Sequence, residues 1–356
     1  HYLEIDGDKL RCVQYWDVPR IKDRPDHGEA WYVERIRELL ESAVKYRMIS
    51  DVPVGAYLSG GLDSSIVVAL MASLTNKPVT TFTIGFEEQG FNEFGFAKQV
   101  AERFGTDHHE IVLPSEDYIE NMRRLVRFKD APLSVPNEPA IYVMSKHLKE
   151  FITVVLSGEG ADELFGGYGR IFRSPFDYQR MKSLLNGSGL QEDEYGAALS
   201  RNLLSKYGDK PLDSELDHFL SLYAYMPWAE KAQYLSADVV ISLNRDRELN
   251  AFFSEHFDSL EGMSQYDKYM WMFEKIHLVG LLHRLDTTTM ATAVEGRVPF
   301  VDHRLVELAQ SIPVEHKLRW KSAAHKAVAG IYNSDQISEV FDDPKYILKK
   351  AFEKNL

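Results

Sequence analysis

Apolar residues in the first half of the chain occur in two alternating kinds of segment, and together these predict a repeated strand–helix unit. Short apolar and β-branched runs that are typical of buried strands occur at residues 54–58, 79–86, 109–113 and 153–156. Apolar residues at helical spacing predict helices at 30–46, 64–74, 92–104, 115–127 and 140–151. Strands that alternate with helices in this way favour an α/β fold, in which helices cover both faces of a mostly parallel sheet.

The pattern changes after about residue 170, where strand-like runs largely disappear and helical spacing dominates. We expect helical segments around residues 211–235, 246–258, 264–288, 303–311 and 321–332. The stretch NGSGLQEDE at 186–194 is polar and rich in glycine, which predicts a solvated loop. The second half is therefore expected to be a helical region added to the α/β core.

The two ends of the chain differ from the regions that they flank. Residues 1–17 alternate in the manner of a β-hairpin with a turn at Asp6-Gly7-Asp8, and residues 18–29 are polar, with two prolines, as in a linker. The main domain is then expected to be 30–356. The chain begins without methionine and ends inside an apparent helix, so we expect both ends to be cut from a longer protein.

Charge and composition narrow the classes of partner. The 356 residues carry a formal net charge of −13, which disfavours contact with nucleic-acid phosphates, so no nucleic-acid partner is expected. Cys12 is the one cysteine, which rules out a disulfide within the chain and a thiolate zinc cluster, and fits a reducing cytoplasm. No apolar run approaches the roughly 20 residues of a membrane span.

The loop after the first strand, SGGLDSS at 59–65, has the features of a phosphate cradle. Backbone N–H groups and hydroxyls that can bind an anion come from Ser59, Gly60, Gly61, Ser64 and Ser65. Asp63 would repel phosphate unless a divalent cation lay between them, so it predicts Mg²⁺. The lysine of a Gly-Lys-Ser/Thr ending is absent. The alternative is an ordinary strand–turn–helix with Asp63 as its cap, which the complete motif disfavours.

A second glycine-rich loop follows the strand at 153–156 and carries three acids. Asp162 could share a metal with Asp63, and Glu159 could act as a general base or accept a hydrogen bond from a substrate amine. An acidic surface turn is the alternative that composition alone leaves open. Because carboxyl ends of parallel strands meet at one edge of a sheet, both loops are expected to face one crevice.

Several motifs resemble one known family. SGGLDSS resembles the PP-loop of the ATP-pyrophosphatase superfamily, whose members cleave ATP to AMP and pyrophosphate. Three further motifs resemble the synthetase domain of glutamine-dependent asparagine synthetases. They are LSGEGADELFGGY at 156–168, LDTTTMATAVEGRVPFVDHRLVELA at 285–309 and PKYILKKAF at 344–352. The resemblance covers about residues 30–356, and the opening 1–17 is similar to the last hairpin of the family's glutaminase domain. It implies a PP-loop domain that uses ATP and Mg²⁺.

The resemblance implies a role for each matching residue. The ATP and pyrophosphate set comprises Tyr57, Leu58, Ser59, Gly60, Gly61, Asp63, Ser64, Ser65, Ile84, Gly85, Ser157, Gly158 and Lys345. Within it, Tyr57 and the Ile84-Gly85 pair match positions that flank the adenine. Asp63 and Asp162 match carboxylates that lie beside the metal ion. Glu159 matches the acid beside the acyl-adenylate, and Lys345 matches a lysine that contacts the phosphates. Without the family, Lys345 would be interpreted as a solvated lysine at a helix start.

Other positions leave open questions. Glu295 and Arg297 in VEGRVPFVD could shape the acceptor pocket or hold two parts of the chain together by ion pairs. Family glutaminases start with a cysteine nucleophile, whereas this chain starts with His1, so the given chain is not expected to hydrolyse glutamine. Some asparagine synthetases have a Thr-Ile-Arg-Ala-Ser stretch near the aspartate site, and this chain has PLSVPNEPAIY at 132–142 in its place, with Pro136 about where the arginine would be. Proline cannot replace an arginine that binds a carboxylate, so this difference speaks against aspartate as the acceptor.

The resemblance implies an ATP-dependent, Mg²⁺-requiring ligase that adenylates a carboxylate and transfers glutamine-derived ammonia to it. Aspartate is the expected carboxylate, which gives asparagine, AMP and pyrophosphate. The alternatives are an amidotransferase for another carboxylate, such as a sugar acid or a secondary-metabolite precursor, and a non-catalytic nucleotide-binding protein. A homodimer is one expectation for the assembly.

Overall fold

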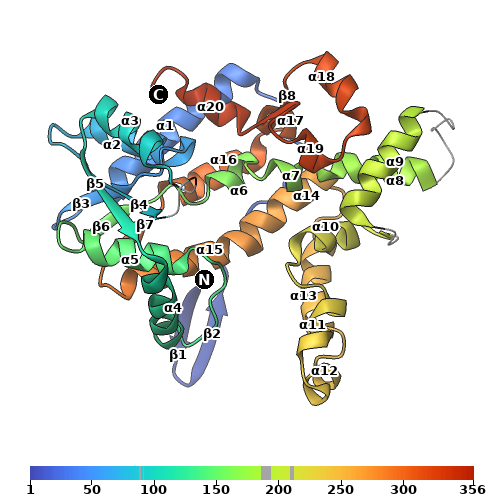
Figure 1. Ribbon diagram of the computed structural model, residues 1–356, viewed down its shortest axis with the longest axis horizontal. Helices are drawn as coiled ribbons and strands as arrows, with labels where there is room; N and C mark the ends of the chain where they lie inside the picture. Colours follow the sequence, from blue (N-terminus) through green and yellow to red (C-terminus); the bar gives the residue numbers. More distant parts are fainter. Residues whose placement is uncertain (88–89, 91, 186–193, 209–211) are drawn as a thin grey trace.

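A parallel sheet of five strands forms the α/β part of the molecule (Figure 1). The computed structural model describes residues 1–87, 90, 92–185, 194–208 and 212–356. The strands of this sheet are β3 (Val54–Tyr57), β4 (Thr80–Phe86), β5 (Asp107–Leu113), β6 (Val154–Leu156) and β7 (Glu295–Arg297). They are ordered β5-β4-β3-β6-β7, and every neighbouring pair is parallel. The expected α/β fold is confirmed.

Strand β7 departs from the sequence-based prediction. It pairs with β6 through Val154 opposite Glu295 and Leu156 opposite Arg297. With only three residues before Val298-Pro299, it has no apolar run that would mark a buried strand. A segment from the half that was expected to be helical therefore completes the sheet beside the second glycine-rich loop.

Helices cover both faces of this sheet. Those that pack around it are α1 (Glu29–Arg47), α2 (Leu62–Leu74), α3 (Phe94–Phe104), α4 (Ser115–Lys129), α5 (Glu138–Leu148) and α15 (Leu278–Met290). Alternation along β6 separates the two faces: Val154 and Leu156 lie in the core cluster with Ile66 of α2, whereas Val155 packs with Leu148 of α5. The loops that follow the strands lie at the carboxyl edge of the sheet.

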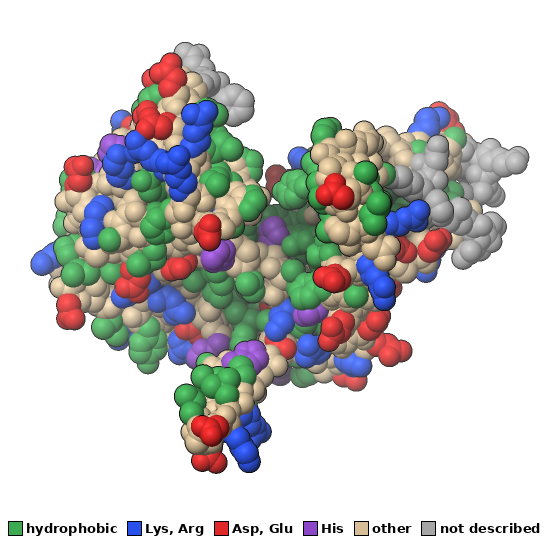
Figure 2. Space-filling view, turned by 90° about the horizontal axis from the view of Figure 1, so that it is seen from below, with side chains coloured by type: hydrophobic (Ala, Val, Ile, Leu, Met, Phe, Trp, Pro, Cys, Tyr) green, Lys and Arg blue, Asp and Glu red, His purple; other side chains and the backbone are tan. Residues whose placement is uncertain are grey.

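The remaining helices are α6 (Ala161–Phe165), α7 (Gly169–Phe172), α8 (Ser174–Leu185), α9 (Glu194–Tyr207), α10 (Glu215–Tyr223), α11 (Trp228–Tyr234), α12 (Ala237–Leu243), α13 (Arg247–Asp258), α14 (Gln265–Met272), the π-helix η1 (Phe273–His277), the 3-10 helices η2 (Pro299–Val301) and η3 (Ala329–Ile331), α16 (His303–Ser311), α17 (Val314–Lys317), α18 (Ala323–Val328), α19 (Ser334–Ile337) and α20 (Tyr346–Phe352). Helices α16 and α20 pack against α1, whereas most of the others form a second part of the molecule, from which α11, α12 and α13 project as an arm (Figure 1). Figure 2 shows a hollow between the sheet part and the arm, with hydrophobic side chains inside it.

The predicted helical segments match this part unevenly. Segments 246–258, 264–288 and 303–311 correspond to α13, to α14 through α15, and to α16, whereas 211–235 is divided between α10 and α11. The loop expected at 186–194 lies outside the described residues, apart from Glu194, which begins α9. In the described part of the chain, no helix is long and apolar enough to cross a membrane.

Two small antiparallel pairs complete the fold. The hairpin predicted at the start is formed by β1 (Tyr2–Asp6) and β2 (Lys9–Val13), with Asp6 opposite Lys9. Near the other end, β8 (Leu318–Trp320) pairs with β9 (Asp342–Pro344), which no sequence pattern predicted. β9 leads directly into α20.

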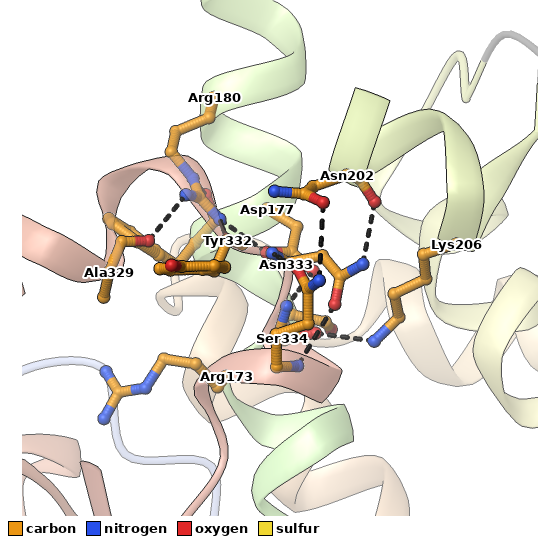
Figure 3. A network of polar contacts seen from close by, with 12 residues as sticks. Arg173, Asp177, Arg180, Asn202, Lys206, Ala329, Tyr332, Asn333 and Ser334 are labelled. Atoms are coloured by element: carbon orange, nitrogen blue, oxygen red, sulfur yellow. Dashed lines mark hydrogen bonds and ion pairs between the residues drawn. The ribbon is translucent and has the colours of Figure 1, made fainter. Parts of the chain in front are cut away.

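A polar network holds the C-terminal segments against α8 and α9 (Figure 3). The carboxylate of Asp177 accepts hydrogen bonds from Arg180 at 2.6 Å and from the N–H of Ser334 at 2.9 Å. Arg180 also donates to the backbone carbonyls of Ala329, Gly330 and Tyr332. Arg173 forms a buried ion pair with Asp342 of β9, at 2.8 Å. This network fixes the segment that ends at Lys345.

Candidate active site

The loops after β3 and β6 touch at the carboxyl edge of the sheet. β3 and β6 are parallel neighbours, with Ala56 opposite Leu156. A Cβ atom on Gly158 would lie 2.9 Å from the Cβ of Asp63 and 3.0 Å from the N of Ser64. Only glycine therefore allows this approach. The two loops are far apart along the chain, and the fold brings them together, as expected.

The first loop is held in shape by its own groups. Gly60 has a φ of +78°, and a Cβ there would lie 2.5 Å from the backbone of α3, so the start of α3 closes over the loop. The hydroxyls of Ser59 and Ser64 lie 2.9 Å apart, and the hydroxyl of Ser65 donates to the carbonyl of Gly61 at 2.7 Å. The loop that the sequence predicts as a phosphate cradle is therefore set in one conformation.

Lys345 reaches this loop from the other end of the chain. Its Nζ lies 2.5 Å from Oδ2 of Asp63 and 2.6 Å from Oδ1 of Asp162, and its side chain is 14% exposed. A Cβ on Gly167 would lie 2.2 Å from the Cε of Lys345, so the second loop also makes room for it. Its backbone φ of +54° is rare outside glycine. This is not the environment of a solvated lysine.

Burial and charge oppose each other in this cluster. Burial raises the pKa of Asp63 to about 6, an effect that the charge of Lys345 only partly offsets. Burial acts to lower the pKa of Lys345, but the carboxylates of Asp63 and Asp162 outweigh it and raise that pKa. Lys345 is therefore an ammonium ion at neutral pH, which is the form that can bind phosphate.

The cluster of Asp63, Asp162 and Lys345 also contains carboxylate oxygens, which are ligands that Mg²⁺ prefers. Oδ1 of Asp63 is buried, and no group of the described residues donates to it. No set of three or more His, Cys, Asp or Glu side chains in the described ranges could hold a metal alone. Because Mg²⁺ is commonly bound by one or two carboxylates together with substrate phosphates, Asp63 and Asp162 fit such a site.

Glu159 of the second loop pairs with a residue that sequence reasoning missed. Its carboxylate forms an ion pair with Nη2 of Arg284 in α15. Burial raises the pKa of Glu159, against the lowering effect of Arg284. One signal could have revealed Arg284, because it lies on the face of α15 that buries Leu281, Leu285 and Thr288. An arginine on a buried helical face needs a partner.

The residues expected around the adenine lie at the ends of β3 and β4. The hydroxyl of Tyr57 lies 2.8 Å from Oγ of Ser145, and burial raises the pKa of Tyr57. The side chain of Leu58 is buried, and its N–H donates to the carbonyl of Phe82 at 2.8 Å. Ile84 packs in the core, and a Cβ on Gly85 would lie 2.5 Å from the ring of Phe94.

Glu295 and Arg297 make contacts within the sheet and with the end of α1. The N–H of Ser157 donates to the carbonyl of Arg297 at 2.9 Å, which supports the second loop. The guanidinium of Arg297 bonds Glu295 at 2.8 Å and the backbone carbonyls of Arg47 and Ile49 at 2.8 and 2.7 Å. These contacts favour a role for Arg297 in holding β7 against the end of α1 over a place in an acceptor pocket, but they do so through hydrogen bonds to backbone carbonyls, because the ion pair joins two residues of the same strand.

Comparison with known proteins agrees with this geometry. A family model described as asparagine synthase matches residues 35–356. The chain is 33% identical over 307 residues to asparagine synthetase [glutamine-hydrolyzing] 1 of Bacillus subtilis, a match that covers 84% of this chain and 47% of that protein. It is 32% identical to a putative asparagine synthetase [glutamine-hydrolyzing] of Mycobacterium bovis, covering 89% of this chain and 48% of that protein.

The chain thus spans about half the length of the curated relatives that it matches. Among solved structures, an NH3-dependent NAD synthetase from Campylobacter jejuni is 16% identical, with a TM-score of 0.28 and coverage of 64% of this chain and 96% of that one. A score this low supports no statement about function. The family match and the two curated relatives together show that the chain belongs to the asparagine synthase family.

Proposed function

We propose that the chain is the synthetase part of an ATP-dependent ligase that adenylates a carboxylate and joins it to ammonia. The products are an amide, AMP and pyrophosphate. Aspartate is the proposed carboxylate, and glutamine is the proposed source of ammonia in the complete protein, as the names of the relatives suggest. No residue of this chain is assigned to the glutamine step.

The position of Lys345 carries this proposal. Its ammonium ion lies between two carboxylates at the mouth of a glycine loop that is shaped to bind an anion. When ATP binds, a phosphate oxygen can replace one carboxylate on Nζ, so that the charge is already in place when the bond breaks. Asp63 and Asp162 would hold Mg²⁺, which would neutralise phosphate charge.

Glu159 supplies the second requirement of this reaction. An amine that attacks an activated carboxyl group must lose a proton, and a carboxylate whose pKa is raised by burial is a better acceptor for it. Glu159 follows Gly158, which lies against Asp63 of the phosphate loop, so a carboxyl group adenylated at this loop would be close to Glu159. We assign it the role of proton acceptor.

Product analysis tests this function. The chain is incubated with ATP, Mg²⁺, aspartate and ammonium chloride, and AMP, pyrophosphate and asparagine are quantified. We expect the three products in equal amounts, and none without aspartate. AMP without asparagine would show that the adenylate reacts with water and not with ammonia, which would contradict amide formation. No AMP with aspartate, but AMP when another acid is supplied, would point to another carboxylate. ATP binding without cleavage in the presence of any acid would favour a non-catalytic nucleotide-binding protein.

A further inference from the structure

A second cleft lies away from the ATP loops, between β8, α8, α17 and the segment 18–29. Its volume is about 600 Å³, which suits a small molecule, and among the described residues none from the two glycine-rich loops lines it. We propose that this cleft binds a free amino acid with an apolar side chain, and that its occupancy is coupled to ATP binding through Lys345. Such an effector site lies outside the proposed reaction, in which no residue of the cleft takes part.

The floor of the cleft is aromatic and is held in place by a buried arginine. The Cζ of Arg173 lies 4.1 Å from the centre of the Trp320 ring, and the ring of Phe176 meets that of Trp320 edge-on, with centres 5.4 Å apart. Arg173 is itself fixed by its ion pair with Asp342 and by its hydrogen bond to the carbonyl of Leu318. The cleft therefore offers a preformed aromatic surface to an apolar group.

Several of the charged side chains at the rim already have partners within the protein. Arg319 forms an ion pair with Glu29 at 2.6 Å. The Nε2 of His316 lies 3.1 Å from a carboxylate oxygen of Asp26. Because these groups satisfy one another, they do not set the charge that a ligand must carry.

Glu315 and Lys326 differ from the other charged groups of the rim. Both line the cleft and are exposed, and neither side chain has a hydrogen-bond or ion-pair partner among the described residues. A ligand that pairs with both must carry a cationic group and an anionic group. A free amino acid has an ammonium group for Glu315 and a carboxylate for Lys326, and an apolar side chain can lie on the aromatic floor.

The wall of this cleft is continuous with the segment that positions Lys345. β8, which lines the cleft, pairs with β9, and Lys345 follows β9 directly. On the other side of Lys345, the guanidinium of Arg319 lies 4.4 Å from the centre of the Tyr346 ring, and the hydroxyl of Tyr346 donates to Glu29 at 3.0 Å. Lys345 has a φ of +54°, a conformation that persists only where the surroundings hold it. An amino acid that fills the cleft stabilises these surroundings, so it should favour ATP binding at Lys345.

Calorimetry with L-phenylalanine and two analogues tests the binding site. Phenylacetate lacks the ammonium group, and phenethylamine lacks the carboxylate. We expect L-phenylalanine to bind about fivefold more tightly than either analogue, because each analogue loses one charge-assisted hydrogen bond. Lys326→Ala should weaken L-phenylalanine by a similar factor without affecting phenethylamine, and Glu315→Gln should weaken it without affecting phenylacetate.

Both substitutions are at exposed positions, so the variants should fold. Lys77→Ala removes an exposed lysine that does not line the cleft and should leave the affinity for L-phenylalanine unchanged. Absence of L-phenylalanine binding to the wild type would overturn the proposal. Binding that is equally tight in Lys326→Ala and Glu315→Gln would overturn it too, because the amino acid would then lie elsewhere.

Titration with a non-hydrolysable ATP analogue and Mg²⁺ tests the coupling. Saturating L-phenylalanine should tighten binding of the analogue about fivefold in the wild type, and the analogue should tighten binding of L-phenylalanine by the same factor. In Lys345→Ala this mutual effect should disappear, while L-phenylalanine still binds. Unchanged or weaker binding of the analogue in the presence of L-phenylalanine would overturn the coupling. Failure of the analogue to bind at all would instead contradict the proposed function.

Discussion

Glu163 shows how a single buried residue beside the candidate site can govern stability. It follows Asp162, is 1% exposed, and accepts a hydrogen bond from the hydroxyl of Tyr168 at 2.7 Å. Burial raises its pKa from 4.5 to about 7, which one hydrogen bond does not prevent. The folded state therefore favours the protonated form of this carboxyl more than the unfolded state does.

This shift predicts a pH-dependent stability. Between pH 4.5 and about 7 the folded state binds more protons than the unfolded state, so the contribution of Glu163 is present at low pH and is lost as the pH rises. Glu163→Gln, which stays neutral, should remove this loss and unfold with a free energy up to about 3 kcal/mol higher than the wild type at pH 8. At pH 4 the two should be similar.

Urea denaturation at both pH values measures the difference. Glu120→Gln, at an exposed position on α4, is the control and should show no such dependence. The interpretation is wrong if Glu163→Gln changes the free energy of unfolding equally at both pH values, because the pKa of Glu163 would then be the same in the folded and unfolded states.

At the scale of elements, β9 and α20 decide where Lys345 lies. The ion pair between Arg173 and Asp342 is buried, with side chains 5% and 0% exposed, and Arg173 also donates to the carbonyl of Leu318 in β8. The two strands and the start of α20 are thus tied to α7 and α8. A buried charge without its partner is strongly unfavourable.

Asp342→Asn should therefore lower the free energy of unfolding by about 3–5 kcal/mol. Because Asp342 lies shortly before Lys345, we also expect an increase in the KM for ATP in the folded variant. Denaturation and pyrophosphate exchange measure the two effects. Glu120→Gln breaks the exposed pair with Arg124 and should change stability by no more than about 1 kcal/mol. Equal effects of the two variants would show that the buried pair contributes nothing.

The elements also show what sequence reasoning could reach. The strands of the expected sheet were placed to within two residues, because short apolar, β-branched runs and the glycine loops that follow them are local signals. β7 was missed, since pairing with β6 rather than its own three residues makes it a strand. Arg284 was missed because its partner Glu159 comes from a different element. Long-range contacts of this kind are not encoded in local spacing.

At the scale of the whole molecule, both parts of the chain share one core. Core residues from α2, α14 and α20 belong to one cluster, in which Phe352 is 2% exposed. The segment expected to be a linker is also attached, because Val18 is buried and its carbonyl accepts a hydrogen bond from Trp271 at 3.3 Å. The sheet and the helical part should therefore unfold together.

Phe352→Ala tests this coupling. Loss of a buried phenylalanine costs about 3–5 kcal/mol, and the loss should appear equally in both parts. The fluorescence of Trp271, measured in a background in which the other four tryptophans are replaced by phenylalanine, reports the helical part, and pyrophosphate exchange reports the loops of the sheet. We expect both to be lost at the same, lower urea concentration than in the wild type. Loss of activity at much lower urea than the change in fluorescence would show that the parts unfold separately.

The central claim is that Lys345, Asp63 and Asp162 form a site for cleavage between the α- and β-phosphates of ATP. Exchange of labelled pyrophosphate into ATP, with aspartate and Mg²⁺ but no amine, tests it most directly in the wild type and in Lys345→Ala. We predict exchange that requires aspartate and falls by about 100-fold or more in the variant, because a preorganised charge is lost. Exchange that is unchanged in Lys345→Ala, or release of ADP and phosphate in place of exchange, would contradict the account.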